Sequence, residues 1–104
     1  MQALASVVDV QRDGEGYLLV AEDWSDGLAA ALAAEEGIPE LGEGHWAVVR
    51  HIRDVVVAQG QQITLRKLNE SGVVTTKELY ALFPGKPLKK AAKIAGVPKP
   101  ASCV

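Results

Sequence analysis

The last nine residues of the sequence, GVPKPASCV at 96–104, contain its only cysteine, Cys103. Gly96 suits the left-handed conformation that ends a helix, whereas Pro98 and Pro100 prevent further helix and keep the backbone extended. A fully extended segment between Gly96 and Cys103 would reach about 23 Å beyond the helix. The pattern predicts a helix that stops at Gly96, followed by a mobile arm over residues 96–104 with Gly96, Pro98 and Pro100 as its hinge.

Cys103 is predicted to be the functional group of this arm. The flanking Pro-Lys-Pro segment offers almost no apolar surface that could bury a thiol, and an exposed free cysteine is normally a liability. A reactive role is therefore favoured over a structural one. The arrangement suggests a tethered thiol that enters a cleft in a partner.

The overall composition is that of an ordinary soluble globular protein, with 48% apolar and 23% charged residues among 104. This length corresponds to one domain, and no apolar run approaches the roughly 20 residues that span a bilayer. The first residues lack the basic and apolar regions of a signal peptide. A single cysteine excludes an internal disulfide and suits a reducing compartment. We therefore expect one domain over residues 1–104, located in the cytoplasm and not in a membrane.

The charges are distributed unevenly along the chain. Residues 1–85 carry six basic and thirteen acidic side chains, whereas residues 86–104 carry five lysines and no acidic side chain. Such a basic segment indicates either a solvated helix face or a surface that docks an acidic partner, and five unopposed charges favour the partner. The predicted docking residues are Lys86, Lys89, Lys90, Lys93 and Lys99.

The periodicity and the capping signals predict an α+β fold dominated by helices. An Asp13-Gly14 turn between two β-prone runs predicts an N-terminal hairpin over 7–20. The helical body spans 24–95, and Trp46, Val49, Ile52 and Val56 form its clearest apolar stripe. Helices are expected over about 24–36, 43–59, 63–70, 75–83 and 87–95. Asp23 or Ser25 is expected to cap the first of them, a capping box runs from Thr75 to Glu78, and Pro87 can sit in the first turn of the last helix.

No residue pattern predicts a metal or a cofactor. His45 and His51 lie six residues apart on one predicted helix, so their side chains point about 120° apart and are unsuited to a shared ion. No Cys-x-x-Cys pair or phosphate-binding glycine loop is present. His45 beside Trp46 at a helix start is interpreted first as a structural histidine.

The segment 63–83 has the pattern of a helix-turn-helix. The second helix of this segment has one basic residue, Lys77, and one acidic residue, Glu78. The corresponding helix of a nucleic-acid-binding domain usually concentrates positive charge. An isoelectric point near 5.6 also disfavours nucleic acid as the partner. A regulatory or DNA-binding role for this segment stays as the alternative function.

Several motifs together resemble the DsrC/TusE family of sulfur-carrier proteins. They are LYALFPGKP at 79–87, KIAGVPKP at 93–100 and CV at 103–104, with DW at 23–24, EGI at 36–38 and HWAVVR at 45–50 upstream. Some DsrC-type members carry a second cysteine eleven residues before the terminal one, and that position here is Ala92. The resemblance is therefore to the single-cysteine, TusE-like form.

The resemblance implies a carrier rather than a stand-alone enzyme. Sulfur would be held as a persulfide on Cys103 and passed between partner proteins. The TusE side of the family implies a TusBCD-like donor and a tRNA-thiolating acceptor, whereas the DsrC side implies docking on a DsrAB-type sulfite reductase. Which of these sulfur pathways is served is left open by the sequence.

Overall fold

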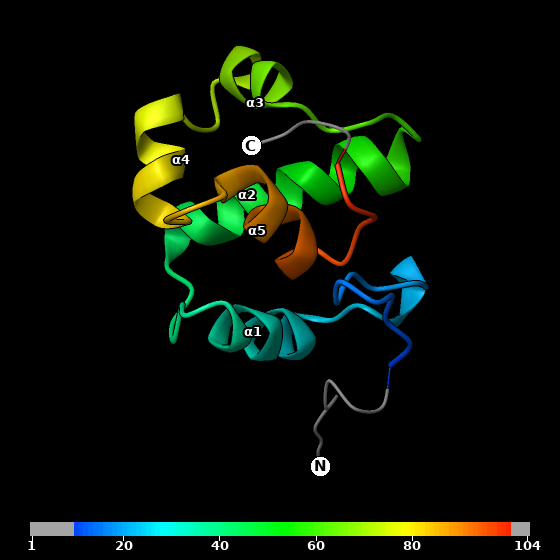
Figure 1. Ribbon diagram of the computed structural model, residues 1–104. Coiled ribbons are helices and arrows are strands. Elements are labelled where there is room, and N and C mark those ends of the chain that lie inside the picture. The colour runs from blue at the N-terminus through cyan, green and yellow to red at the C-terminus, as the bar shows by residue number, and fades with distance from the viewer. Residues whose placement is uncertain (1–9, 101–104) are drawn as a thin grey trace.

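The computed structural model describes residues 10–100, which form a small helical domain (Figure 1). Within this range there are five α-helices, one short 3-10 helix and one π-helix. In chain order the elements are η2 (3-10, Ala21–Asp23), α1 (Asp26–Glu35), α2 (Glu43–Arg53), η3 (π, Asp54–Ala58), α3 (Leu65–Ser71), α4 (Thr76–Leu82) and α5 (Pro87–Ile94).

The helices begin where the capping signals predict. The Ser25 side chain accepts a hydrogen bond from the Leu28 amide at 3.1 Å and caps α1. The Thr75 and Glu78 side chains each bond the other's backbone amide, at 3.1 and 3.0 Å, and complete the predicted capping box of α4. Pro87 occupies the first turn of α5, as expected.

Helix α5 is the central element of the fold, because it packs against α1, α2 and α4 (Figure 1). Its inner face is fully buried, and the small side chains of Ala91 and Ala92 let the neighbouring helices approach closely. Leu88 and Ile94 supply the larger apolar contacts of the same face. This packing holds the C-terminal segment of the chain against the body.

The second predicted helix differs from the structure in its last turn. Instead of one α-helix to about Gln59, α2 ends at Arg53 and a π-helix follows, in which the Gln59 amide bonds the Asp54 carbonyl at 3.0 Å. This wider turn shifts the side-chain register. Ile52 is fully buried as predicted. Beyond it Val55 is buried in the core, whereas the predicted Val56 is only partly buried and packs against the core.

The predicted N-terminal hairpin is present only as a turn with one antiparallel bridge, between Arg12 and Leu18. No strand occurs within residues 10–100, and residues 7–9 of the expected first strand lie outside the described part. The Asp13 carboxylate bonds the Tyr17 amide at 2.9 Å and closes the turn. Tyr17 and Leu18 are both buried, so this segment lacks the alternation of buried and exposed side chains that a half-buried strand shows. Core packing of consecutive side chains therefore overrides the β pattern.

Two helix-ending glycines provide a matched test of this packing. Gly72 and Gly96 have similar left-handed φ angles, 78° and 70°, but a Cβ at Gly72 would meet nothing within 4 Å, whereas one at Gly96 would lie 2.5 Å from Trp24 Cδ1. We expect Gly72→Ala to lower the free energy of unfolding by about 1–2 kcal/mol. Gly96→Ala should cost about 1–3 kcal/mol more, because it also overpacks the indole. Urea denaturation measures both, and equal losses would contradict the packing described at Gly96.

Candidate functional site

The candidate site is built around the C-terminal end of α5 and the segment that follows it. The Gly96 amide bonds the Lys93 carbonyl at 3.1 Å, and the Val97 amide bonds the Ala92 carbonyl at 3.2 Å. With Gly96 in the left-handed conformation, this is the glycine-ended helix stop that the sequence predicts. Val97 is fully buried, so the packed body extends past the predicted boundary at residue 95.

The described part of the predicted arm, residues 96–100, follows the surface of the body. Pro98 and Lys99 are exposed, whereas Pro100 is buried again. The Lys99 ammonium lies 2.9 Å from the Glu15 carboxylate in the N-terminal turn. The expected free extension from Gly96 onward is thus replaced over these residues by contacts with the body, because Val97 and Pro100 supply apolar surface that the sequence interpretation had discounted. Cys103 lies outside the described residues.

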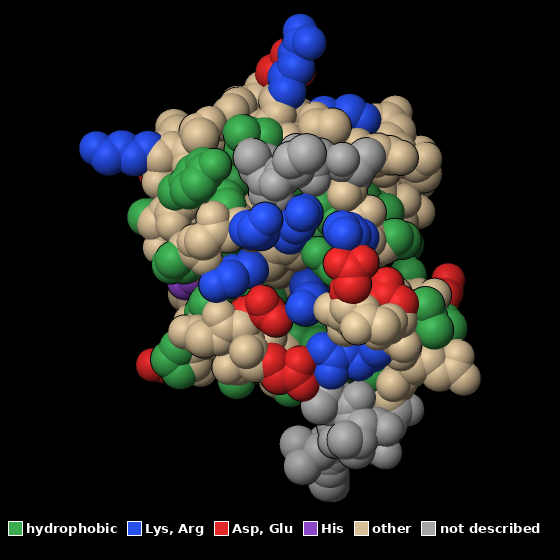
Figure 2. Space-filling view, viewed as in Figure 1, with side chains coloured by type: hydrophobic (Ala, Val, Ile, Leu, Met, Phe, Trp, Pro, Cys, Tyr) green, Lys and Arg blue, Asp and Glu red, His purple; other side chains and the backbone are tan. Residues whose placement is uncertain are grey.

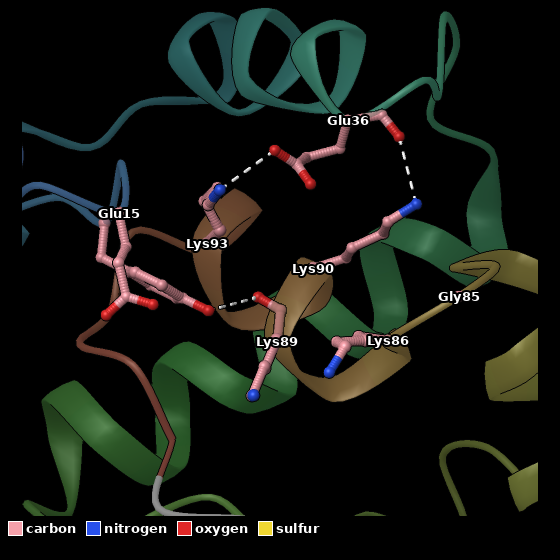
Figure 3. Close-up of a pocket in the computed structure, with 8 residues that line it drawn as sticks. Glu15, Glu36, Gly85, Lys86, Lys89, Lys90 and Lys93 are labelled. Atoms are coloured by element: carbon pink, nitrogen blue, oxygen red, sulfur yellow. Dashed lines mark hydrogen bonds and ion pairs between the residues drawn. The ribbon is translucent and has the colours of Figure 1, made fainter. Parts of the chain in front are cut away.

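Four of the predicted docking lysines line one groove with a volume of about 340 Å³ (Figures 2 and 3). The groove runs along the outer face of α5, opposite the face that packs into the core. Figure 2 shows a band of basic side chains on this face with acidic side chains next to it. The lining residues are Lys86, Lys89, Lys90 and Lys93 together with Glu15, Tyr17, Glu36 and Gly85.

Two of these lysines are held by Glu36, at the end of α1 (Figure 3). The Lys93 ammonium lies 3.1 Å from the Glu36 carboxylate, and both side chains are only about one fifth exposed (17% and 20%). The Lys90 ammonium donates to the Glu36 backbone carbonyl at 3.4 Å. Lys93 also lies over the Tyr17 ring, 5.4 Å from its centre. These contacts give Lys90 and Lys93 a structural role inside the molecule.

Lys86 and Lys89 differ from the other three predicted docking lysines, because neither makes a side-chain ion pair or hydrogen bond with any residue in the range 10–100. In Figure 3 both side chains point away from Glu36. By contrast, the hydrogen bond from Lys99 to Glu15 raises the pKa of the Lys99 ammonium, and the charge of Glu15 adds to this effect. The structure thus brings the predicted lysines to one face but divides them into paired and unpaired groups.

Sequence reasoning missed the acidic and aromatic members of this site. Glu15 lies within the turn that Asp13 closes, Glu36 follows the last residue of α1, and Tyr17 is packed between the turn and α5. The only available signal was the excess of acidic residues in the first part of the chain, which does not identify individual partners. Pairing between residues more than fifty positions apart requires the tertiary structure.

His45 has the structural role that the sequence interpretation favoured. Its Nδ1 accepts a hydrogen bond from the Gly42 amide at 3.0 Å, and its Nε2 lies 2.9 Å from the Leu82 carbonyl. The ring also packs edge-on against Phe83, with a centre-to-centre distance of 5.2 Å. His45 therefore caps α2 and ties it to the end of α4. Residues 10–100 contain no cluster of side chains suited to a metal ion and no helix that could cross a membrane.

Comparisons with known proteins agree over nearly the whole chain. The family model described as DsrC like protein matches residues 6–104. Sulfurtransferase TusE of Salmonella typhimurium is 41% identical over 105 residues, which cover 92% of this chain and 94% of the relative. The solution structure of DsrC from Allochromatium vinosum has a TM-score of 0.78 and 33% identity, covering 91% of this chain and 90% of that one. The crystal structure of the oxidised gamma-subunit of the dissimilatory sulfite reductase (DsrC) from Archaeoglobus fulgidus has a TM-score of 0.75 and 32% identity, covering 91% and 92%.

The division of the lysines should be visible in their reactivity. At limiting amounts of an acylating reagent, we expect Lys86 and Lys89 to be modified several-fold faster than Lys93 and Lys99. The Lys93 ammonium is held against Glu36 and is only 17% exposed, and the contact with Glu15 raises the pKa of Lys99. Peptide mass spectrometry measures the site-specific rates. As a control, Glu36→Gln should raise the rate at Lys93 and leave that at Lys99 unchanged. Uniform rates at all four lysines would contradict the division.

Proposed function

Because the chain belongs to the DsrC-like protein family, we propose that it carries sulfur as a persulfide on Cys103 and passes this sulfur between partner proteins. The observation that carries the proposal is the family match over residues 6–104, which includes both the helix that ends at Gly96 and the cysteine beyond it. Cys103 is the only thiol of the chain and therefore the only residue able to hold a persulfide.

The transfer is a thiol–persulfide exchange. The Cys103 thiolate attacks the outer sulfur of a donor persulfide, so that a new S–S bond forms and the donor leaves as a thiolate. Cys103 then carries the outer sulfur, and an acceptor thiolate removes it by the same reaction. No external oxidant or reductant is consumed in either step.

The sulfur relay for tRNA 2-thiouridine synthesis is the pathway that we assign. The curated relatives named Sulfurtransferase TusE are 39–41% identical, whereas the DsrC structures are 32–33% identical. The position of the second cysteine in some DsrC-type members is Ala92 here, which is fully buried in α5. Chemistry that links two cysteines of one chain through sulfur is therefore absent, and a TusBCD-like donor with a tRNA-thiolating acceptor fits the remaining single thiol.

Docking on an acidic partner is assigned chiefly to Lys86 and Lys89. They line the groove beside the segment that leads to Cys103 and are unpaired within residues 10–100. Lys90, Lys93 and Lys99 would contribute less, because a partner would first have to compete with Glu36 or Glu15. The docking set predicted from the sequence is thus narrowed to its two unpaired members.

The persulfide assignment is tested by loading. After incubation with persulfidated TusBCD complex of Escherichia coli, the intact mass of the protein should increase by about one sulfur atom, and dithiothreitol should reverse the increase. Cys103→Ala should abolish the gain while leaving the melting temperature within about 1 °C, because it changes one small side chain seven positions beyond the helix stop at Gly96. A mass gain that persists in the variant would refute the assignment.

The pathway is tested separately in cells. In an E. coli strain that lacks its own TusE, expression of this chain should restore 2-thiouridine in tRNA, as measured by nucleoside mass spectrometry, and Cys103→Ala should not. If loading succeeds in vitro but 2-thiouridine stays absent, the carrier function stands and the tRNA pathway is refuted.

Charge reversal tests the docking surface. The double variant Lys86→Glu/Lys89→Glu should slow association with TusBCD by about tenfold or more at low salt and flatten the dependence of this rate on ionic strength. Arg66→Glu/Lys77→Glu makes the same change in net charge on α3 and α4, away from the groove, and should retain most of the rate. Stopped-flow fluorescence gives both rates, and equal losses in the two variants would show that only net charge matters.

A further inference from the structure

The end of α5 is capped by two side chains from distant parts of the chain. A helix leaves its last four carbonyls without partners in the helix, and at the surface water usually satisfies them. In α5, however, the Trp24 indole N–H donates to the Ile94 carbonyl at 2.8 Å, and the Arg53 guanidinium donates to the Ala95 carbonyl at 2.8 Å. These two donors lie 70 and 42 residues before the carbonyls that they bind.

Trp24 and Arg53 also hold each other in place. The guanidinium carbon of Arg53 lies 4.3 Å from the centre of the Trp24 ring, so the two planar groups are stacked. A second N–H of Arg53 donates to the Ala21 carbonyl at 3.1 Å and fixes the guanidinium to η2. Partial burial accompanies these contacts and lowers the pKa of Arg53. The pair is a rigid unit with contacts to η2, α2 and α5.

The same unit contacts the first residue of the outgoing segment. The Trp24 indole lies directly against Gly96, where a Cβ would approach Cδ1 to 2.5 Å. Leu18 closes the other side, at 3.0 Å from the same hypothetical Cβ. Gly96 is therefore enclosed, and the direction in which the backbone continues toward Val97 and Lys99 is determined by the surrounding side chains.

We propose that Trp24 and Arg53 are positioning residues for Cys103, because they set the direction in which residues 97–100 leave α5. This inference rests on the proposed carrier function, since a thiol that must enter a partner's cleft depends on the orientation of the segment that bears it. Ile94 and Ala95 are fully buried, so their carbonyls need donors from the protein, and both donors come from the two side chains that stack on each other beside Gly96. A displacement of about 1 Å can slow a geometry-dependent reaction by about a hundredfold.

Conservative variants weaken these contacts but keep an aromatic ring at position 24 and a positive charge at position 53. Trp24→Phe loses the indole N–H, and Arg53→Lys loses the planar fork that spans two carbonyls. Helix α2 supplies a matched control pair, because Arg50 lies 5.1 Å from the Trp46 ring and its guanidinium donates to Asp26 of α1 rather than to α5. Trp46→Phe and Arg50→Lys therefore make the same chemical changes elsewhere. If circular dichroism shows that one of the test variants, Trp24→Phe or Arg53→Lys, does not fold, the other variant alone is used for the measurements.

The first measurement reports the direction in which the C-terminal segment leaves α5, and it does not require any sulfur transfer. A nitroxide attached to Cys103 broadens the amide signals of the residues that it approaches. We expect the pattern of broadening over the body to change in Trp24→Phe and Arg53→Lys and to stay as in the unsubstituted protein in Trp46→Phe and Arg50→Lys. An unchanged pattern in the test variants would overturn the claim that the pair sets direction.

The second measurement is sulfur transfer from persulfidated TusBCD, compared with alkylation of Cys103 by iodoacetamide. In the test variants the maximal transfer rate should fall about tenfold or more, while KM and the alkylation rate stay within about twofold of the unsubstituted protein. Transfer rates equal to those of the control variants would overturn the positioning role and leave the pair only a stabilising one. If the unsubstituted protein accepts no sulfur, the proposed function itself is refuted, and the nitroxide pattern still decides whether the pair sets direction.

Discussion

The burial of one face of α5 is the constraint on which the rest of the structure depends. Leu88, Ala91 and Ala92 are packed against three other helices, so the opposite face of α5 has to lie at the surface. The helical period then places the lysines of α5 together along the groove, with Lys93 facing the end of α1. Burial of this face of α5 therefore determines both where the C-terminal segment is anchored and where the lysines of α5 lie.

The acidic body of the protein neutralises part of this basic surface. Glu36 holds Lys93 and Lys90, and Glu15 holds Lys99, so three of the five lysines are engaged within the chain. Surface ion pairs contribute little to stability, typically 0–1 kcal/mol. Their more important effect is on the field near the groove, because pairing leaves the positive potential concentrated at the N-terminal end of α5. A partner would therefore meet a small and directed basic surface rather than a broad one.

Local signals in the sequence predicted the parts of this fold that depend on neighbouring residues. The caps at Ser25 and Thr75 and the stop at Gly96 follow from backbone chemistry within a few positions, and the structure confirms each of them. The π-helix after Arg53 and the consecutive burial of Tyr17 and Leu18 depend on tertiary packing, which periodicity does not encode. The candidate site shows the same difference. Its lysines were visible as a charge cluster, whereas their acidic partners and the contacts of Trp24 with α5 join residues more than fifty positions apart.

The enclosure of Gly96 by Trp24 has a spectroscopic consequence. The chain has only two tryptophans, and one of them is in contact with the first residue of the segment that leads to Cys103. The indole is stacked on a cation and hydrogen-bonded to a helix carbonyl, and both contacts influence the emission of an indole ring. A protein in which Trp46 is replaced would therefore contain a single tryptophan, at the base of the arm. Movement of this segment during an encounter with a partner could then be followed by light emission without any attached dye.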